Sequence, residues 1–325
     1  MRHLLMALLL SAVSPLAQAL EELKLLAEQP VDGMPQGNLS GLAWCGEALW
    51  AVSDREDDRL YRLEGSGDSA WQARAEIFEA PAAPLSGLPW GLRMRNWANG
   101  QVRGGQLDFE DLSCDAAGTR YLVSETRAAV LRLPLAGSPG WLVLPANLTR
   151  QARANGLLLQ FNAAFEGLAF DPAGERLWLV AERERRGLLA MRRQQATWRC
   201  EGGCVLLSEG GVESLPGAPQ GQALARDFSA LAFFGERLFT LERQGRRICR
   251  RSLAGAVERC WSFAEEASSA ARRYDQPYGM AEGLWLDEQG AWIGLDNGGL
   301  ARGDGDTRPF VWRLAAPAAG WSAQP

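Results

Sequence analysis

The sequence has almost no histidine and almost no lysine. Its one histidine is His3, close to the N-terminus, and its one lysine is Lys24. Without further histidines the chain cannot form a Ser-His-Asp or Cys-His nucleophile system, a histidine phosphatase site or a zinc site built on imidazole. The single lysine argues against Schiff-base chemistry in the same way. Any chemistry must therefore use carboxylates, arginines, backbone groups, water or a metal ion.

Long apolar runs and excess basic charge are also missing. Beyond the N-terminal segment no stretch is apolar for 18 residues, so we expect no membrane span. The net charge of -5 argues against nucleic-acid binding, which requires a basic face. The 47% of hydrophobic residues and the 13 tryptophans are enough for one large core, and we expect a monomer.

The first nineteen residues have the pattern of a secretory signal peptide. A short basic start, Met1-Arg2-His3, precedes the apolar residues 4–13 and a small-x-small end at Ala17-Gln18-Ala19. This pattern predicts cleavage before Leu20 and a mature protein in the periplasm or outside the cell. An uncleaved anchor is the alternative, but the apolar run is too short to span a bilayer. Residues 20–325 then form one domain, without any histidine.

One pattern of two apolar runs joined by a turn occurs five times along this domain. The first runs begin at Ser40-Gly41-Leu42, Glu110-Asp111-Leu112, Glu166-Gly167-Leu168, Ser229-Ala230-Leu231 and Glu282-Gly283-Leu284. The second runs reach an acidic residue at Asp54, Glu125, Glu182, Glu242 and Asp296. Turns rich in Asp, Gly and Pro separate the two runs, which is typical of a β-hairpin. In most copies a third run follows, and a fourth is visible at residues 71–78 and 257–263.

Four-stranded units that recur in this way predict an all-β fold, a single β-propeller. The mean spacing from Asp54 to Asp296 is about 60 residues, which favours five blades. Six blades are the alternative and would require a spacing near 50 residues and one unrecognised copy. The last copy has three runs, so we expect residues 22–26 to supply its outer strand and close the ring.

The six cysteines are an even number, as expected for disulfides in an oxidising compartment. Cys200 and Cys204 could close a small loop, and Cys249 and Cys260 could bridge neighbouring strands. Cys45 and Cys114 lie near the ends of the first strands of adjacent blades and form the remaining candidate pair. The alternative for this last pair is two buried free thiols.

The start of the first strand and the end of the second strand of a blade lie at the same face of a propeller. Eight carboxylates should therefore meet at one mouth of the central channel: Glu110, Glu166, Glu282, Asp54, Glu125, Glu182, Glu242 and Asp296. Two carboxylates about 4 Å apart repel each other by about 4 kcal/mol at an effective dielectric near 20. Such a ring must raise its pKa values or bind cations. Oxygen ligands without histidine or cysteine favour Ca²⁺, and Mg²⁺ or Mn²⁺ fit less well.

Three arginines directly follow acids of this set: Arg55, Arg183 and Arg243. If each strand has ended there, the arginines rim the mouth and could bind an anionic ester. The alternative is that they only neutralise the acids as internal ion pairs. Two insertions, residues 84–106 and 145–162, interrupt the repeat and are expected to carry the substrate rim. Alternatively, Trp90 and Trp97 of the first insertion only pack it onto the ring.

Three blocks of the sequence resemble the phytase-like propeller family, described as "esterase-like activity of phytase". They are Leu107-Asp108-Phe109-Glu110-Asp111-Leu112, residues 162–170 around Phe165-Glu166-Gly167-Leu168, and Met280-Ala281-Glu282-Gly283-Leu284. The resemblance implies an exported propeller with calcium-dependent phosphoesterase or esterase activity. β-Propeller phytases place several lysines near phosphate, and their absence here argues against phytate as substrate. The opening block, Asn38 to Trp44 with Trp50 to Asp54, is also similar to the SdiA-regulated propeller proteins, which implies a binding or structural module.

Two functions of different class follow from these observations. In the first, the protein is a metal-dependent hydrolase of a small anionic ester, with Glu166, Glu182 and Glu282 as catalytic residues and Ca²⁺ at the acids. Arg55, Arg183 and Arg243 would then bind the substrate. In the second, the ring holds a structural cation, and the protein binds an envelope ligand without turnover.

Overall fold

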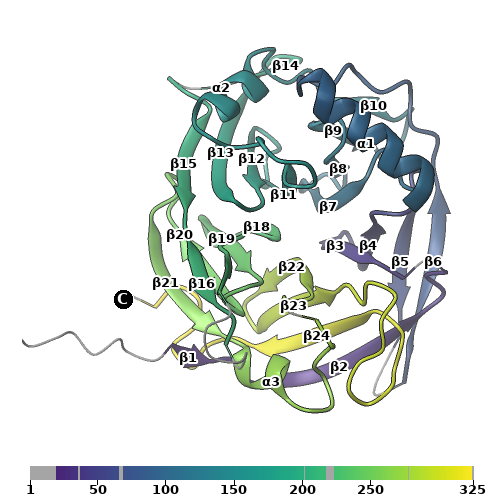
Figure 1. Ribbon diagram of the computed structural model, residues 1–325, viewed down its shortest axis with the longest axis vertical. Coiled ribbons are helices and arrows are strands. Elements are labelled where there is room, and N and C mark those ends of the chain that lie inside the picture. Colours follow the sequence, from purple (N-terminus) through teal and green to yellow (C-terminus); the bar gives the residue numbers. More distant parts are fainter. Residues whose placement is uncertain are drawn as a thin grey trace, which may run out of the picture.

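The computed structural model describes residues 20–323 with the exception of residues 36, 66–68, 201, 217–222 and 277. β-Strand is the main secondary structure of this part of the chain, and antiparallel sheets stand around a common centre (Figure 1). The expected all-β propeller architecture is confirmed. The predicted signal peptide, residues 1–19, lies outside the described residues.

Consecutive strands form the sheets, as the repeated hairpins predict. The first group contains β3 (Leu39–Cys45), β4 (Ala48–Ser53), β5 (Arg59–Glu64) and β6 (Trp71–Ile77). The next contains β7 (Phe109–Cys114), β8 (Arg120–Ser124), β9 (Ala129–Leu133) and β10 (Gly140–Trp141). It is followed by β11 (Phe165–Phe170), β12 (Arg176–Ala181) and β13 (Arg185–Gln194), to which β14 (Thr197–Arg199) and β15 (Val205–Gly210) both pair.

The remaining strands complete the ring. One sheet contains β18 (Ala230–Phe234), β19 (Arg237–Glu242), β20 (Arg247–Arg251) and β21 (Val257–Ser262). The last repeat supplies β22 (Ala281–Asp287), β23 (Gly290–Leu295) and β24 (Phe310–Ala315). A small separate hairpin consists of β16 (Val212–Ser214) and β17 (Ala223–Ala225). Three helices lie outside the sheets: α1 (Trp90–Arg103), α2 (Leu148–Ala154) and α3 (Ala264–Ser268).

An N-terminal strand joins the last repeat, but its bounds differ from those predicted. β2 (Leu25–Asp32) pairs antiparallel with β24, and its end also runs parallel to the start of β6. The prediction that an N-terminal strand supplies the outer strand of the last repeat is confirmed, but the predicted bounds, residues 22–26, are wrong, because β1 (Glu21–Glu22) pairs with β21 of the preceding sheet. Leu23, 2% exposed, lies in the core between these two sheets and breaks the run into two strands.

The hydrophobic core lies between neighbouring sheets. One cluster joins β8 and β9 to β11–β13 and α2, and a second joins β18–β21 to β22–β24. At the centre, the first strand of each repeat contacts the next in a closed cycle, β3 to β7 to β11 to β18 to β22 and back to β3. These contacts hold the starts of the first strands at a common axis.

Three disulfides confirm the pairing expected from the sequence. Cys45–Cys114 links the ends of β3 and β7 in adjacent sheets, Cys200–Cys204 closes a small loop, and Cys249–Cys260 joins directly opposed residues of β20 and β21. The alternative of free thiols at Cys45 and Cys114 is therefore wrong. Disulfides of this kind form and persist in oxidising compartments.

Both insertions fold into helical segments on the same part of the ring (Figure 1). The first carries α1 and the second carries α2. Trp90 and Trp97 are 69% and 57% exposed. The alternative that these side chains pack the first insertion onto the ring is therefore wrong. No helix among the described residues is long and apolar enough to cross a membrane.

Removing the Cys45–Cys114 disulfide should destabilise the protein more than removing Cys200–Cys204. The two bridges close segments with sequence separations of 69 and 4 residues. Loop-closure entropy then gives about 4 kcal/mol for the first and about 2 kcal/mol for the second. The double variants Cys45→Ala/Cys114→Ala and Cys200→Ala/Cys204→Ala can be compared by urea denaturation. An equal loss in the two variants would contradict the expectation.

Candidate functional site

A cavity of about 570 Å³ opens at one mouth of the central channel. Acids of both predicted series line it: Asp54, Glu110, Glu166, Glu182, Glu282 and Asp296. Four arginines also line it: Arg55, Arg103, Arg183 and Arg243. Glu125 lies beside Glu110 and Glu166, one layer deeper. The sequence-based expectation that the acids converge is thus met at seven of the eight positions.

A β-bulge places four of the five residues at which the first runs begin, Ser229 being the exception. The pairing of β3 with β4 skips a residue at Ser40, and equivalent shifts occur at Glu110, Glu166 and Glu282. A bulge adds an unpaired residue and re-aims its side chain, which is why bulges are frequent beside functional sites. The bulge in each of these four strands therefore directs Ser40, Glu110, Glu166 or Glu282 toward the mouth of the channel.

The second series reaches the mouth by a different route. Asp54, Glu125, Glu182 and Asp296 each directly follow the last residue of β4, β8, β12 or β23. Once the strand has ended, the side chain is no longer fixed to one face of the sheet. These acids can therefore turn inward beside the bulged residues of the neighbouring strand.

Two overlapping groups of three carboxylates lie close enough to share a cation. Asp54, Asp108 and Glu110 form one group, and Glu110, Glu125 and Glu166 form the other. In each group the three carboxylate oxygens lie within 4.8 Å of one another. At this distance two ionised carboxylates repel by about 3 to 4 kcal/mol at an effective dielectric near 20. Each group therefore requires either a bound cation or a proton on at least one of its carboxyls.

The pKa values of Glu110, Glu125 and Glu166 are all raised, as expected for carboxyls that are buried close together. Burial, with Glu166 next in importance, raises the pKa of Glu110 well above its usual range. Burial, together with Glu125 and Glu282, does the same to the pKa of Glu166. Burial also raises the pKa of Glu125, although the backbone N–H of Ala164 donates to it at 2.8 Å. The carboxyls of this group therefore tend to hold protons when no cation is bound.

Arg243 holds the opposite side of the mouth. It is 8% exposed and donates to Glu182, Glu282 and Asp227, the last at 2.6 Å. The Nε, Nη1 and Nη2 groups of Arg243 all donate to acids. Burial alone would lower the pKa of its guanidinium, but the neighbouring acids outweigh burial and raise it. Arg243 therefore lines the cavity with its guanidinium already paired to acids, as in the alternative that the arginines neutralise the acids internally.

The other arginines remain partly accessible. Arg183 contacts Glu182 and donates to the carbonyl oxygen of Asn162 at 2.6 Å, with 33% of its side chain exposed. Arg55 lies 3.3 Å from Asp54 with 23% of its side chain exposed. Arg103, at the end of α1, also pairs with Asp54 and donates to the side-chain oxygen of Asn162 at 3.3 Å. Arg55 and Arg183 thus lie at the mouth of the channel and are partly exposed, as the sequence predicts for arginines of the rim.

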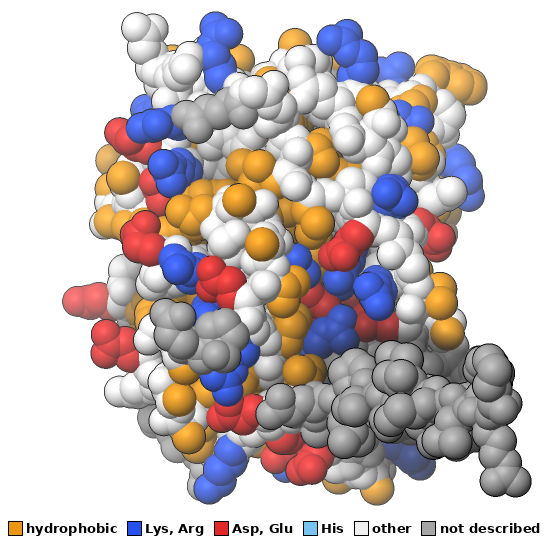
Figure 2. Space-filling view, turned by 90° about the vertical axis from the view of Figure 1, so that its left-hand side faces the viewer, with side chains coloured by type: hydrophobic (Ala, Val, Ile, Leu, Met, Phe, Trp, Pro, Cys, Tyr) orange, Lys and Arg blue, Asp and Glu red, His pale blue; other side chains and the backbone are white. Residues whose placement is uncertain are grey.

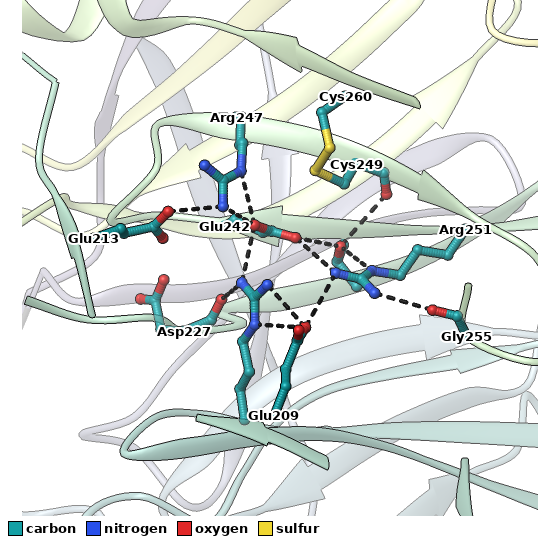
Figure 3. The surroundings of a disulfide bond; sticks show 11 residues. Glu209, Glu213, Asp227, Glu242, Arg247, Cys249, Arg251, Gly255 and Cys260 are labelled. Atoms are coloured by element: carbon teal, nitrogen blue, oxygen red, sulfur yellow. Dashed lines mark hydrogen bonds and ion pairs between the residues drawn. A yellow bond between two sulfur atoms is a disulfide. The ribbon is translucent and has the colours of Figure 1, made fainter. Parts of the chain in front are cut away.

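Glu242 does not join the channel acids, which corrects the sequence-based expectation. It lies in a separate network between sheets, where Arg186, Arg247 and Arg251 all contact its carboxylate (Figure 3). Unlike its counterparts, Glu242 is the last residue of its strand and pairs in register with Arg247. Burial opposes ionisation, but the three arginines outweigh it and lower the pKa of Glu242 to about 2. An acid neutralised in this way is unsuited to bind a metal ion.

Sequence reasoning missed three residues of the site: Asp108, Arg103 and Asp227. A signal for two of them was present, because Asp108 and Asp227 precede Glu110 and Ser229 by two residues, as Asn38 precedes Ser40. Asn38 and Asp108 both have φ of 54°, a left-handed conformation that Asn and Asp adopt more readily than most residues. Arg103 had no such signal, since α1 brings it in from the insertion.

Comparison with known proteins assigns the chain to a family. A family model described as "Phytase-like: Esterase-like activity of phytase" matches residues 34–202, about half of the chain. The chain belongs to the phytase-like family. The matched segment includes Asp54, Glu110, Glu125, Glu166 and Glu182. Sequences of curated proteins gave no match.

Several solved structures are similar in fold. The gluconolactonase XC5397 from Xanthomonas campestris is 12% identical with a TM-score of 0.41, over 84% of this chain and 71% of that chain. The PQQ-bound aldose sugar dehydrogenase from Streptomyces coelicolor is 15% identical with a TM-score of 0.44, over 90% and 98% of the two chains. A virginiamycin B lyase from Staphylococcus aureus is 11% identical with a TM-score of 0.41, over 91% and 100%. These likenesses carry no information on activity.

Replacement of Glu242 by glutamine should destabilise the fold strongly. The variant leaves three arginines around a neutral amide in a buried network, a change that typically costs about 3–5 kcal/mol. Urea denaturation of Glu242→Gln measures the loss, and Glu288→Gln in an exposed turn is the matched control. A loss below about 1 kcal/mol would show that the network contributes little.

In buffer without divalent cations, the protein should become less stable as the pH rises from about 4 to about 8. Burial, despite Arg243, raises the pKa of Glu282 to about 8, and burial raises the pKa of Asp296 to about 6. A carboxyl whose pKa is higher in the folded state stabilises the fold at low pH, and this contribution disappears as the pH passes the folded pKa. We expect the melting temperature to fall by about 5 °C or more across this range.

The double variant Glu282→Gln/Asp296→Asn provides the control for this experiment. It should show a smaller change in melting temperature with pH, because it lacks two of the carboxyls with raised pKa values and keeps those of Glu110, Glu125 and Glu166. Thermal denaturation followed by circular dichroism between pH 4 and pH 8 measures both proteins. An equal slope in the two proteins would contradict the assignment of the effect to these carboxyls.

Proposed function

We propose that this protein is an exported hydrolase of small anionic esters that depends on Ca²⁺ bound at the channel mouth. The observation that carries the proposal is the pair of overlapping carboxylate groups that share Glu110. The arginines beside them supply positive charge at the rim, where an anionic ester would enter. Membership of the phytase-like family supports a reaction at an ester bond.

We further propose that the ring has five blades. The supporting observation is that the described strands fall into four-stranded groups: β3–β6, β7–β10, β11–β13 with β15, β18–β21, and β22–β24 with β2. Each group has one repeat of the sequence pattern at its inner hairpin. The cycle of contacts between first strands closes without a further member.

The donor set fits Ca²⁺ better than other ions. All candidate ligands are carboxylate oxygens, contributed by Asp54, Asp108, Glu110, Glu125 and Glu166. Ca²⁺ accepts six to eight oxygens in flexible arrangements, whereas Mg²⁺ demands near-octahedral geometry and retains water molecules. When bound, Ca²⁺ would supply Lewis-acid polarisation of a phosphoryl or acyl oxygen and lower the pKa of water. The raised pKa values of Glu110 and Glu166 mean that their protons must leave before an ion binds.

The residues around this donor set have separate roles. Arg55 and Arg183 bind the anionic group of the ester through their partly exposed guanidinium groups. Glu182 contacts both Arg183 and Arg243 and fixes the position of the former. Glu282 accepts a hydrogen bond from Arg243 at Oε1, so Oε2 can hold a proton at neutral pH and donate it to the leaving oxygen.

A non-catalytic binding protein with a structural cation is the second candidate. One observation favours it: each of the four arginines at the mouth already contacts an acid of the chain. If those ion pairs persist when ligand is present, the mouth has no free cation for an anionic ester. The two candidates share the metal site and differ only in turnover.

Hydrolysis should require both Ca²⁺ and Glu166. The purified mature protein can be assayed with p-nitrophenyl phosphate, phytate and short p-nitrophenyl acyl esters, with Ca²⁺ or with a chelator. We expect Ca²⁺-dependent turnover of at least one ester other than phytate, since Lys24 is the only lysine. Glu166→Gln should lower kcat/KM by about 100-fold or more, and Glu282→Gln by a similar factor that Ca²⁺ does not restore. Glu288→Gln serves as the control variant.

Melting temperatures separate the two candidate functions. Saturating Ca²⁺ should raise the melting temperature of the native protein, with about 4 kcal/mol of stabilisation at 1,000 times the dissociation constant. Glu166→Gln should remove this increase. Stabilisation without turnover on any ester would support the binding protein. If Ca²⁺ has no effect on either melting or turnover, both candidates lose their metal site.

A further inference from the structure

Two insertions on one part of the ring contain no acidic residue. Residues 80–107 and residues 126–165 contain neither Asp nor Glu, although the whole chain has 39 acidic and 34 basic residues. The insertions at residues 84–106 and 145–162, which lie within these segments, contain five arginines: Arg93, Arg95, Arg103, Arg150 and Arg153. Elsewhere the charges are mixed, as on the outer side with β13, β15 and β21, where acidic and basic side chains alternate (Figure 2). The insertions therefore give one part of an acidic protein a local positive charge.

Helix α1 in the first insertion also exposes a stripe of large apolar side chains. Trp90, Met94 and Trp97 are 69%, 41% and 57% exposed. Their spacing of four and three residues places them on one face of the helix. Val102, near the end of the helix, is 89% exposed. Val102 lies about 120° around the helix axis from Trp90, so the stripe itself consists of Trp90, Met94 and Trp97. An exposed group of large apolar side chains on a soluble protein marks an interaction surface.

Other residues attach α1 to the ring, so the stripe is not needed for folding. Leu88 and Leu92 pack against the core cluster that contains Leu148 and Ala152 of α2. Thr149 of α2 donates through its Oγ1 to the carbonyl oxygen of Gly87 at 3.2 Å.

The far end of α1 is held in the same way. Arg103 pairs with Asp54 at the channel mouth. The guanidinium carbon of Arg95 lies 4.8 Å from the ring centre of Phe161 in the second insertion. Contacts at both ends of α1 therefore fix the orientation of the stripe, and its tryptophans point away from the ring.

We propose that this surface, the α1 face, docks on an anionic phospholipid bilayer. We define the α1 face as Trp90, Met94, Trp97 and Val102 together with the exposed Arg95 and Arg150. Tryptophan partitions to the boundary between headgroups and acyl chains, and arginine pairs with phosphate. A helix that lies flat on a membrane combines an apolar stripe with basic residues at its edges.

A bilayer fits this face better than an acidic protein does. The stripe lies on the outer side of a helix and forms a convex surface, whereas a peptide ligand requires a groove. The absence of acids through both insertions prevents local repulsion from the negative surface potential of the membrane. The channel mouth, which Arg103 links to α1, would then lie close to the lipid headgroups. The proposal does not depend on the hydrolase function.

Vesicle flotation tests the proposal. The mature protein is mixed with vesicles of phosphatidylcholine alone, or of phosphatidylcholine with about one quarter phosphatidylglycerol, at about 0.1 M salt. We expect flotation with the anionic vesicles, at least about ten-fold weaker binding to the neutral ones, and release at about 0.5 M salt. Trp90→Ser/Trp97→Ser and Arg95→Gln/Arg150→Gln should each reduce binding about ten-fold or more.

Matched substitutions outside the α1 face, on the neighbouring strands β5 and β6, provide the controls. Ile77→Ser removes an equally exposed apolar side chain from β6, and Arg62→Gln/Arg74→Gln removes two exposed arginines from β5 and β6. These controls should bind like the native protein. Melting temperatures confirm that each variant is folded. No flotation with anionic vesicles, equal binding to neutral vesicles, or unchanged binding of the α1 variants would each overturn the proposal.

Discussion

The structure depends on one buried carboxylate at the axis of the ring. Asp111 of β7 is 1% exposed, and the backbone N–H groups of Leu112 and Leu168 donate to it at 2.8 and 3.1 Å. The N–H groups of Leu42 and Leu231 also contribute to its hydrogen bonding. One side chain thus satisfies backbone donors from strands of four different repeats, which would otherwise be buried without partners.

Close packing of the first strands around Asp111 leaves no room for a side chain at Gly41 or Gly167. A Cβ at Gly41 would lie 2.5 Å from the Cα of Asp111, and a Cβ at Gly167 would lie 2.8 Å from the backbone nitrogen of Leu231. The first strands can therefore approach closely only because these positions lack a side chain. The residue before each of these glycines is the bulged one, so close packing at the axis and the inward direction of Ser40 and Glu166 have the same cause.

Much of this architecture could be predicted from the sequence, because the same hairpin pattern occurs in each repeat and each hairpin corresponds to two neighbouring strands of a sheet. Periodic hairpins gave the strands, and equivalent positions gave the convergence of Glu110, Glu166 and Glu282. Glu242 was misplaced because the sequence does not show whether an acid is the last residue of a strand or the first after it. Arg103 was missed because a residue of an insertion reaches the mouth only through tertiary packing. The bounds of β2 were missed because Leu23 continues the apolar run while its backbone leaves the strand.

The excess of acids over arginines at the channel mouth means that the site is stable only when protons or cations offset its negative charge. Nine acids of the described chain lie at or just beneath it: Asp54, Asp108, Glu110, Glu125, Glu166, Glu182, Asp227, Glu282 and Asp296. Four arginines face them, so five negative charges would remain if every acid were ionised. Arg243 and Arg183 offset two of the three charges of Glu182, Asp227 and Glu282, which leaves four of the five excess charges among the other six acids. Protons can remove part of that excess, because burial and the neighbouring carboxylates raise the pKa values of Glu110 and Glu166. A divalent cation can also offset this negative charge. Glu110 belongs to both carboxylate groups, so a cation bound beside Glu110 would stabilise the ionised form of the largest number of acids.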